Sequence, residues 1–203
     1  MKKGIIIGLV ILLVVGGGIG YFFYDLKKKE SEYETKLSST LKQIESSTFE
    51  SAMLASDYQK YWGDIIKMSI PSSTLASELG ILEKEVESYL DYSNTAYFTG
   101  MRIGLEEGDI DTMIELVAYA KYKEIKSVKK NHNEVEKSIK DLKNPPKKYT
   151  DIYDDLLQIY EVYNTFVSLS TSPVGSYNDY SENINSTYET LSSKIKTTKL
   201  QLQ

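Results

Sequence analysis

The chain has 203 residues, of which 41% are hydrophobic and 26% charged, and its formal net charge is −5. It contains no cysteine, which excludes a disulfide scaffold, a thiolate zinc site, a cysteine nucleophile and a lipid-modified N-terminal cysteine. Its single histidine excludes a multi-histidine metal site and argues against a Ser-His-Asp triad. Only four prolines occur, so long segments lack helix breakers.

The N-terminus combines a Lys2-Lys3 pair with an uncharged, mainly apolar run over residues 4–24. At about 1.5 Å per residue, this run forms a helix of about 31 Å, close to the thickness of a bilayer's hydrocarbon core. Aromatic residues end it and Lys27, Lys28 and Lys29 follow, as at a membrane interface. The sequence therefore predicts a membrane anchor over residues 1–29, with its transmembrane helix at 4–24. A signal peptide cleaved among the glycines at 16–20 is the alternative.

The orientation of this anchor depends on two rules that disagree. Counting lysines on both flanks places the larger positive charge, and therefore the rest of the chain, in the cytoplasm. The short Lys2-Lys3 start is typical of a secretory segment, which leaves the rest of the chain outside. We expect an extracytoplasmic domain at the cell membrane, and the cytoplasmic orientation stays open.

Residues 30–203 predict one all-α domain, an antiparallel bundle of four to five helices. Apolar residues recur three and four positions apart, and no long segment alternates with a period of two. Five helices are expected from the apolar stripes. The first stripe runs from Leu37 to Met68 and is interrupted at Thr48 and Ser51, and the second runs from Leu82 to Tyr97, with its helix fraying at 100–108. The third runs without a break from Ile110 to Leu142, the fourth from Tyr149 to Val167 and the fifth from Tyr177 to Ile195.

Turn residues mark the boundaries between the later helices. Asn144-Pro145-Pro146 cannot continue a helix, because proline lacks the backbone N–H. The next helix is expected to begin at Lys148-Tyr149 or Thr150-Asp151. Ser-Pro-Val-Gly-Ser at 172–176 predicts a second turn, and Asp109 or Asp111 is expected to cap the third helix.

The acidic run at residues 106–111 does not follow the calcium-loop pattern. Counted from Asp109, the sixth and twelfth positions hold Ile114 and Ala120 instead of glycine and glutamate. We interpret these carboxylates as partners of a helix dipole, and no metal site is predicted. The chain also lacks a nucleophile elbow, a phosphate loop and a dinucleotide fingerprint. We therefore predict a protein without catalytic residues or a cofactor.

His132 lies on the third apolar stripe. A di-iron bundle would need glutamate at position 129, where this chain has lysine, and no second ligand stands at motif spacing. We expect a packed histidine with Glu136 within hydrogen-bonding reach. A pH-sensing role is the alternative.

One segment reverses the acidic balance of the chain. Between Lys121 and Lys148 there are ten lysines and four acidic residues, a local net charge of +6. Helical spacing predicts an exposed lysine ridge opposite Val128 and Val135, made of Lys123, Lys126, Lys130, Lys137 and Lys140. This ridge is a candidate site for a phosphate-rich polymer or anionic lipid headgroups. It contains no arginine, so nucleic acid is not the expected partner, and a solvated helix face is the alternative.

Tyrosine outnumbers phenylalanine by seventeen to five. The helical spacing predicts that most tyrosines pack between helices with their hydroxyls at the rim, and stacking on sugars or bases is the alternative. Tyr58, Tyr61 and Trp62 are interpreted in the same way. Seven tyrosines gather in the last two predicted helices, at positions 149, 153, 160, 163, 177, 180 and 188.

The C-terminal segment resembles a two-helix pattern of uncharacterised anchored helical proteins and lipoproteins of low-GC Gram-positive bacteria. The resemblance is carried by Asn144-Pro145-Pro146, Tyr149, Tyr153, Leu156, Tyr160, Tyr163-Asn164, residues 172–176 and Tyr180. It implies a cell-surface helical domain and supplies no catalytic residue.

We therefore expect a single-pass membrane protein whose non-catalytic bundle binds a protein or another component of the cell envelope. Two alternatives stay open. One is a solute-binding or sensor module with its ligand between helices, near the tyrosines and Trp62. The other is an anionic-polymer binder that uses the lysine ridge between Lys123 and Lys148.

Overall fold

A computed structural model gives the fold. It describes residues 2–66, 70–89 and 107–202, with side chains for 24–66, 70–89 and 111–202. Within these ranges the chain forms seven α-helices, one 3-10 helix and no strand, which confirms the all-α prediction. The features expected at Met68, Leu90 and Tyr97, and the fraying expected at 100–106, lie outside the described residues.

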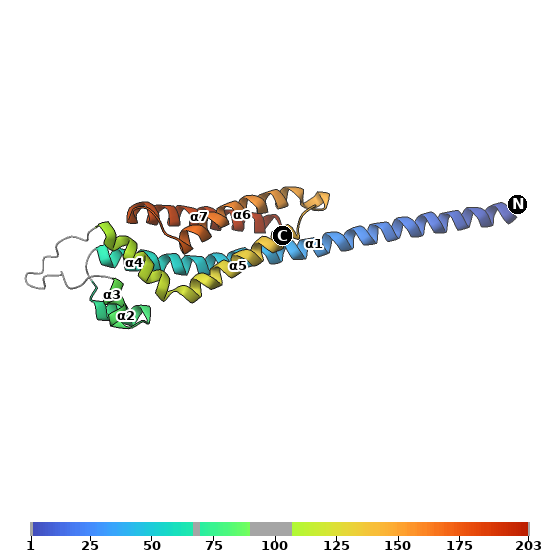
Figure 1. The fold of residues 1–203 in the computed structure, drawn as a ribbon. Coiled ribbons are helices and arrows are strands. Elements are labelled where there is room, and N and C mark those ends of the chain that lie inside the picture. Colours follow the sequence, from blue (N-terminus) through green and yellow to red (C-terminus); the bar gives the residue numbers. More distant parts are fainter. Residues whose placement is uncertain (1, 67–69, 90–106, 203) are drawn as a thin grey trace, which may run out of the picture.

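Helix α1 (Lys2–Ile66) is the longest element and runs without a break across residue 30, the expected start of the domain. Its N-terminal part projects beyond the other helices as a single rod (Figure 1). The predicted transmembrane helix at 4–24 belongs to this part, and the side chains of residues 1–23 lie outside what the structure describes. Among the described residues, no helix is long and apolar enough to cross a membrane. The anchor stays a prediction.

The apolar stripe of α1 forms the centre of the core, with Leu37, Leu41 and Tyr58 fully buried. The polar residues that interrupt this stripe are buried as well. The hydroxyls of Thr48 and Ser51 donate to backbone carbonyls one turn earlier, at distances of 2.7 and 2.9 Å. These back-bonds satisfy the hydroxyls without a partner helix, so the stripe stays packed through its polar middle.

Four long helices, α1, α5 (Tyr122–Lys140), α6 (Thr150–Thr171) and α7 (Tyr177–Gln201), pack side by side and alternate in direction (Figure 1). The ion pair between Lys199 and Glu45 joins the end of α7 to the bundle's part of α1, as expected for antiparallel helices. Tyr163 bonds Ser47, and Tyr33 stacks on Tyr149, so α6 runs parallel to α1. The described residues therefore form an up-down-up-down bundle.

The third predicted stripe, from Ile110 to Leu142, is divided in two, so the prediction of one unbroken helix is wrong. Helix α4 (Glu107–Ala120) ends before Lys121, whose φ of −99° and ψ of 22° leave helical geometry. Backbone hydrogen bonds still link Lys121 to Val117 and to Ile125, so the break is a kink and not a loop. A kink keeps the three-and-four spacing of apolar residues, which is why the pattern does not reveal it.

The predicted cap of the third helix is also wrong. Asp109 and Asp111 both lie inside α4, because the helix already includes Glu107. Carboxylates within the first turns of a helix still complement its dipole, so the sequence pattern fits the observed position as well as the expected one.

Two short helices, α2 (Ser72–Leu79) and α3 (Glu83–Tyr89), lie beside the C-terminal part of α1, where Glu78 pairs with Lys60. Helix α2 was not predicted, since eight residues are too few to show a period. It ends at Gly80, whose φ of +70° is left-handed, and the N–H groups of Gly80 and Ile81 donate to carbonyls of the last turn. This Schellman ending needs glycine, so Gly80 was the residue in the sequence that could have indicated the end of a helix here.

Both predicted turns between the later helices are confirmed. Asn144 adopts a φ of +64° before the two prolines, a 3-10 helix follows at Lys147–Tyr149, and α6 begins at Thr150. Ser176 caps α7, since its hydroxyl oxygen accepts the N–H of Asp179 at 3.1 Å. The two turns let three long helices fold back on one another within 80 residues of sequence, from 122 to 201.

Candidate binding surfaces

A groove runs between α1 and α7 on the surface of the bundle. It has a volume of about 460 Å³ and is lined by Glu45, Thr48, Phe49, Tyr188, Ser192, Ile195, Lys196, Lys199 and Leu200. Phe49 is 65% exposed and Leu200 is 61% exposed, although both are large apolar side chains. Phe49 and Met53 lie on the face of α1 opposite its buried stripe, and Met53 is 58% exposed.

The rim of the groove is polar and slightly basic. Lys199 on α7 pairs with Glu45 on α1, which ties the two walls together at one end. Lys196 is exposed and makes no ion pair with a described residue. Tyr188 packs against Phe166 at a ring-centroid distance of 5.7 Å, which fixes its position in the wall. An apolar floor with an unpaired lysine at its edge suits an apolar ligand that carries negative charge.

His132 belongs to a polar seam between α5 and α6. Its Nε2 lies 2.6 Å from Oδ1 of Asn164, and its ring stacks on Tyr160 and Tyr163. Glu136, which was expected to bond the ring, binds Lys140 instead. The packed histidine predicted from the sequence is therefore observed half-buried, with a different partner.

The tyrosine prediction holds for packing, whereas several of the hydroxyls lie in the core and not at the rim. Tyr149, Tyr163 and Tyr180 are buried, whereas Tyr188 is 41% exposed. Burial raises the pKa of Tyr163 from 10.0 to about 12, although its bond to Ser47 lowers it. The hydroxyls of Tyr58 and Tyr180 are buried and have no hydrogen-bond partner among the described residues, so they do not reach the rim.

Trp62 extends this unpaired region. Its ring stacks on Tyr180 at 5.5 Å, and its buried Nε1 also has no described partner. The side chains of Tyr58, Trp62 and Tyr180 are all fully buried at one end of the α1–α7 interface. Three unpaired polar atoms in one aromatic cluster are unusual, because a buried polar group without a hydrogen bond costs stability.

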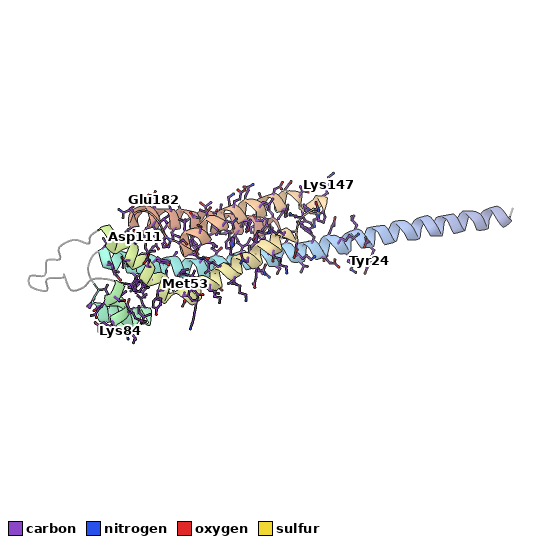
Figure 2. The ribbon with its side chains drawn as sticks, viewed as in Figure 1. Tyr24, Met53, Lys84, Asp111, Lys147 and Glu182 are labelled. Carbon is purple, nitrogen blue, oxygen red and sulfur yellow. The ribbon has the colours of Figure 1, made fainter. Side chains whose placement is uncertain are left out.

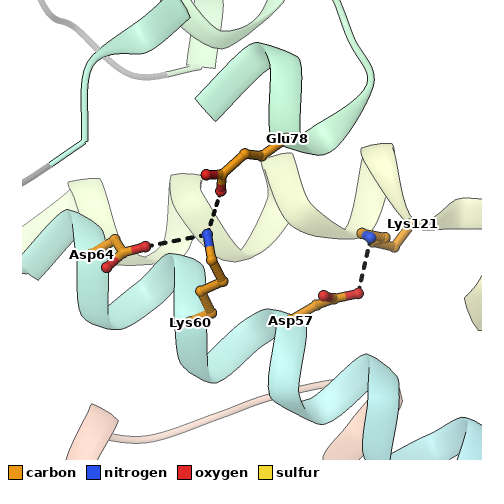
Figure 3. Close-up of polar contacts among 5 residues, drawn as sticks. All are labelled: Asp57, Lys60, Asp64, Glu78 and Lys121. Carbon is orange, nitrogen blue, oxygen red and sulfur yellow. Dashed lines mark hydrogen bonds and ion pairs between the residues drawn. The ribbon is translucent and has the colours of Figure 1, made fainter. Parts of the chain in front are cut away.

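Ion pairs join α1 to the short helix α2 and to the kink (Figure 3). Lys60 binds Glu78 of α2 and lies 3.4 Å from Asp64. Lys121 lies 2.9 Å from Asp57, and both side chains are less than one-third exposed. Burial lowers the pKa of Lys121, but the hydrogen bond and charge of Asp57 outweigh this effect and raise it above its ordinary value. The charged residue on the third apolar stripe is therefore held by a partner.

The predicted lysine ridge is exposed. Lys123, Lys126, Lys130, Lys137 and Lys140 are all exposed, while Val128 and Val135 on the opposite face of α5 are each 1% exposed. The lysines differ in their partners. Lys140 pairs with Glu136, and Lys130 lies 3.7 Å from Glu134. Lys123, Lys126 and Lys137 form no ion pair with a described residue.

Within the part of the chain whose side chains are described, no group of three or more His, Asp or Glu residues is placed to hold a metal ion. Of the acidic run at 106–111, only Asp111 has a described side chain, and it is exposed at the end of the bundle far from Lys147 (Figure 2). The interpretation of the other carboxylates stays a prediction.

The chain matches no protein-family model, curated protein or solved structure. The likeness of its C-terminal segment to anchored helical proteins of low-GC Gram-positive bacteria therefore stays a prediction from the sequence.

Sequence reasoning missed the groove between α1 and α7. A signal was present, since Phe49 and Met53 are apolar, four positions apart and out of register with the buried stripe of α1. An exposed apolar pair of this kind indicates a second contact face on a helix. The other wall, with Tyr188 and Leu200, depends on how α7 packs and has no comparable signal.

Proposed function

We propose that this chain is a single-pass membrane protein whose non-catalytic bundle lies outside the cytoplasm and binds an amphipathic helix of another cell-envelope protein. The binding site in this proposal is the α1–α7 groove. The observation that carries it is the exposure of Phe49 and Leu200, at 65% and 61%, on the two walls of one groove. The membrane part of the proposal rests on the apolar run at 4–24.

The dimensions of the groove favour a helix over a small molecule. Its wall on α7 extends from Tyr188 to Leu200, which at about 1.5 Å per residue is about 18 Å, or three helical turns. A partner helix with apolar residues at positions i, i+3 or i+4, i+7 and i+11 presents a stripe of about 17 Å, close to this length. Burying one such large apolar side chain contributes about 1.5–3 kcal/mol, so two or three anchors supply a useful affinity.

The charge of the rim defines the partner further. Lys199 is already neutralised by Glu45, whereas Lys196 has no described counter-charge. An Asp or Glu beside the partner's apolar stripe would pair with Lys196, and this pairing would favour one orientation of the helix. The proposed partner is therefore an apolar helix with at least one acidic flanking residue.

Site-specific photocrosslinking tests the groove. A photoreactive phenylalanine analogue at position 49 of the full chain, in intact membranes, is expected to give one discrete crosslinked partner. Adding Lys196→Glu should remove most of that product, because it places a negative charge opposite the partner's acid. Leu157, which is 37% exposed on α6 and does not line the groove, is the control position. Equal crosslinking at positions 49 and 157, or none at position 49, contradicts the proposal.

The topology is tested separately. Protease added to intact cells should digest the bundle and leave a small anchored fragment, whereas a bundle digested only after lysis would reverse the orientation. Mature protein that begins within residues 16–20 and is released from cells would replace the anchor by a cleaved leader. The orientation result does not change the crosslinking readout, because the groove is the same on either side of the membrane. Released protein would leave no bundle in the membranes to crosslink, so retention of the anchor is established first.

A further inference from the structure

The exposed face of α5 carries a narrow strip of lysines. With about 100° between successive residues, Lys123, Lys126, Lys130 and Lys137 fall within about 60° of one another around the helix. They stand opposite Val128 and Val135, which pack into the bundle. The strip is therefore the part of α5 that faces furthest from the core, and it is formed by a different helix from either wall of the groove.

These lysines do not stabilise the bundle by pairing. Lys123, Lys126 and Lys137 have no ion pair with a described residue, and the pair of Lys130 with Glu134 is long and solvent-exposed, at 3.7 Å. Lys126 follows Lys123 by three positions and precedes Lys130 by four, and like charges at these spacings disfavour a helix. A cost of this kind is offset when an anion occupies the strip.

The spacing of the strip suits an extended anion. Along the axis of α5, Lys123 and Lys137 are about 21 Å apart, at about 1.5 Å per residue. A single phosphate group would contact one or two of the lysines, whereas a chain of phosphates would contact all four. The chain as a whole is acidic, with a net charge of −5, so the strip is also the region to which a polyanion is steered.

The direction of the strip argues against a lipid surface, and this step rests on the proposed membrane tether. Helix α5 packs along α1, with Asn131 bonded to Glu50 and Ser138 bonded to Gln43 (Figure 1). If α1 crosses the membrane, α5 lies along the same axis and runs back toward the bilayer, so only the Lys137 end of the strip faces the headgroups. A polymer that extends outward from the membrane would run along the whole strip.

We propose that Lys123, Lys126, Lys130 and Lys137 form a binding site for a linear, phosphate-rich polymer of the cell envelope. The site recognises charge and spacing, not bases, because α5 contains no arginine for bidentate base contacts. Attraction to a row of phosphates releases counterions, so binding weakens steeply with salt.

The test measures binding of end-labelled linear polyphosphate to the full chain in uncharged detergent, over a series of salt concentrations. The triple variant Lys123→Glu, Lys130→Glu, Lys137→Glu should lose at least about tenfold in affinity, and the slope of log affinity against log salt should become shallower by about 2–3. The corresponding Lys→Gln triple variant should lose less. The control variant changes Lys36, Lys42 and Lys84 to Glu. These lysines are also exposed, and the three substitutions change the net charge by the same amount.

Three outcomes overturn the proposal. Equal losses of affinity in the Lys→Glu variant of the strip and in the control variant mean that only the net charge of the protein matters. Single-stranded DNA that binds more tightly than polyphosphate at equal phosphate concentration makes the strip a nucleic-acid surface. Anionic vesicles that compete as well as free polyphosphate make it a lipid surface. Because the groove and the tether contribute nothing to this measurement, its failure leaves the proposed function standing.

Discussion

The buried tyrosines show how much one hydroxyl depends on its neighbour. Tyr163 and Tyr180 are both fully buried, and both sit in interfaces with α1. The hydroxyl of Tyr163 lies 2.6 Å from that of Ser47, whereas the hydroxyl of Tyr180 has no described partner. A buried hydroxyl gains about 0.5–1.5 kcal/mol from a hydrogen bond and costs about 1–3 kcal/mol without one. The same side chain therefore has opposite effects at the two positions.

Replacing each tyrosine by phenylalanine separates these effects. Tyr163→Phe should lower the free energy of unfolding by about 1–2 kcal/mol, because it also leaves Ser47 without its partner. Tyr180→Phe should leave stability unchanged or raise it. Thermal unfolding of the full chain in mild detergent, followed by far-ultraviolet circular dichroism, measures both. A clear loss of stability in Tyr180→Phe would instead indicate that a buried water or a bound solute satisfies this hydroxyl.

At the scale of one element, the kink between α4 and α5 is held from outside the helix. Lys121 has an apolar neighbourhood along its own stripe, and its counter-charge is Asp57 on α1. Because both side chains are less than one-third exposed, their interaction is less screened than that of a surface pair. The pair fixes where the α4–α5 segment bends over α1.

Asp57→Asn tests this pair. The substitution keeps the shape of the side chain and leaves Lys121 partly buried without a counter-charge, so the free energy of unfolding should fall by about 1–2 kcal/mol. For a chain of this size, that corresponds to a midpoint lower by about 2–8 °C. Glu134→Gln is the matched control, because it breaks the exposed pair with Lys130 and should cost less than about 0.5 kcal/mol. Equal effects of the two substitutions would mean that the kink does not depend on Asp57.

At the scale of the whole molecule, the C-terminal part of the long helix α1 belongs to the bundle and its N-terminal part projects from it. Lys147 lies at the end of the bundle from which α1 projects, and Glu182 lies at the opposite end (Figure 2). The core along this length is rich in tyrosine. Burial raises the pKa of Tyr58 from 10.0 to about 12, and burial followed by the charge of Tyr153 does the same for Tyr33.

These raised pKa values predict cooperative unfolding in alkali. The folded state keeps the buried tyrosines protonated up to about pH 12, while the unfolded chain begins to lose their protons near pH 10. The unfolded state then binds fewer protons, so the stabilisation present below pH 10 is lost between about pH 10 and 12. Tyrosinate absorbance and helical circular dichroism should change together in this range.

Two variants sharpen the alkaline prediction. Tyr58→Phe should shift the unfolding midpoint to higher pH, because it removes one buried titrating group. Tyr122→Phe, at a position that is 64% exposed, should leave the midpoint unchanged. Complete formation of tyrosinate below about pH 11 with the helices intact would show that burial does not protect these side chains.

Much of the fold was predictable because the apolar residues of a helix recur at three and four positions, a pattern that can be seen within a short segment. The stripe from Leu37, the turn at Asn144-Pro145-Pro146 and the turn at 172–176 depend on residues a few positions apart. The kink at Lys121 was not predictable, because it preserves that spacing and its ion-pair partner is Asp57, 64 positions away in the chain. Helix α2 escaped prediction because two turns show no clear period.

Of the candidate surfaces too, some could be predicted from the sequence and others could not. By itself, the sequence determined the apolar N-terminal run, the all-α class and the lysine ridge, since each is a property of one continuous segment. Only the tertiary structure decided that Phe49 meets Tyr188 and Leu200 across a groove, and that Tyr163 has a hydroxyl partner while Tyr180 has none among the described residues. These outcomes depend on the register between helices, which is set by packing over the whole interface and not by any single stretch of residues.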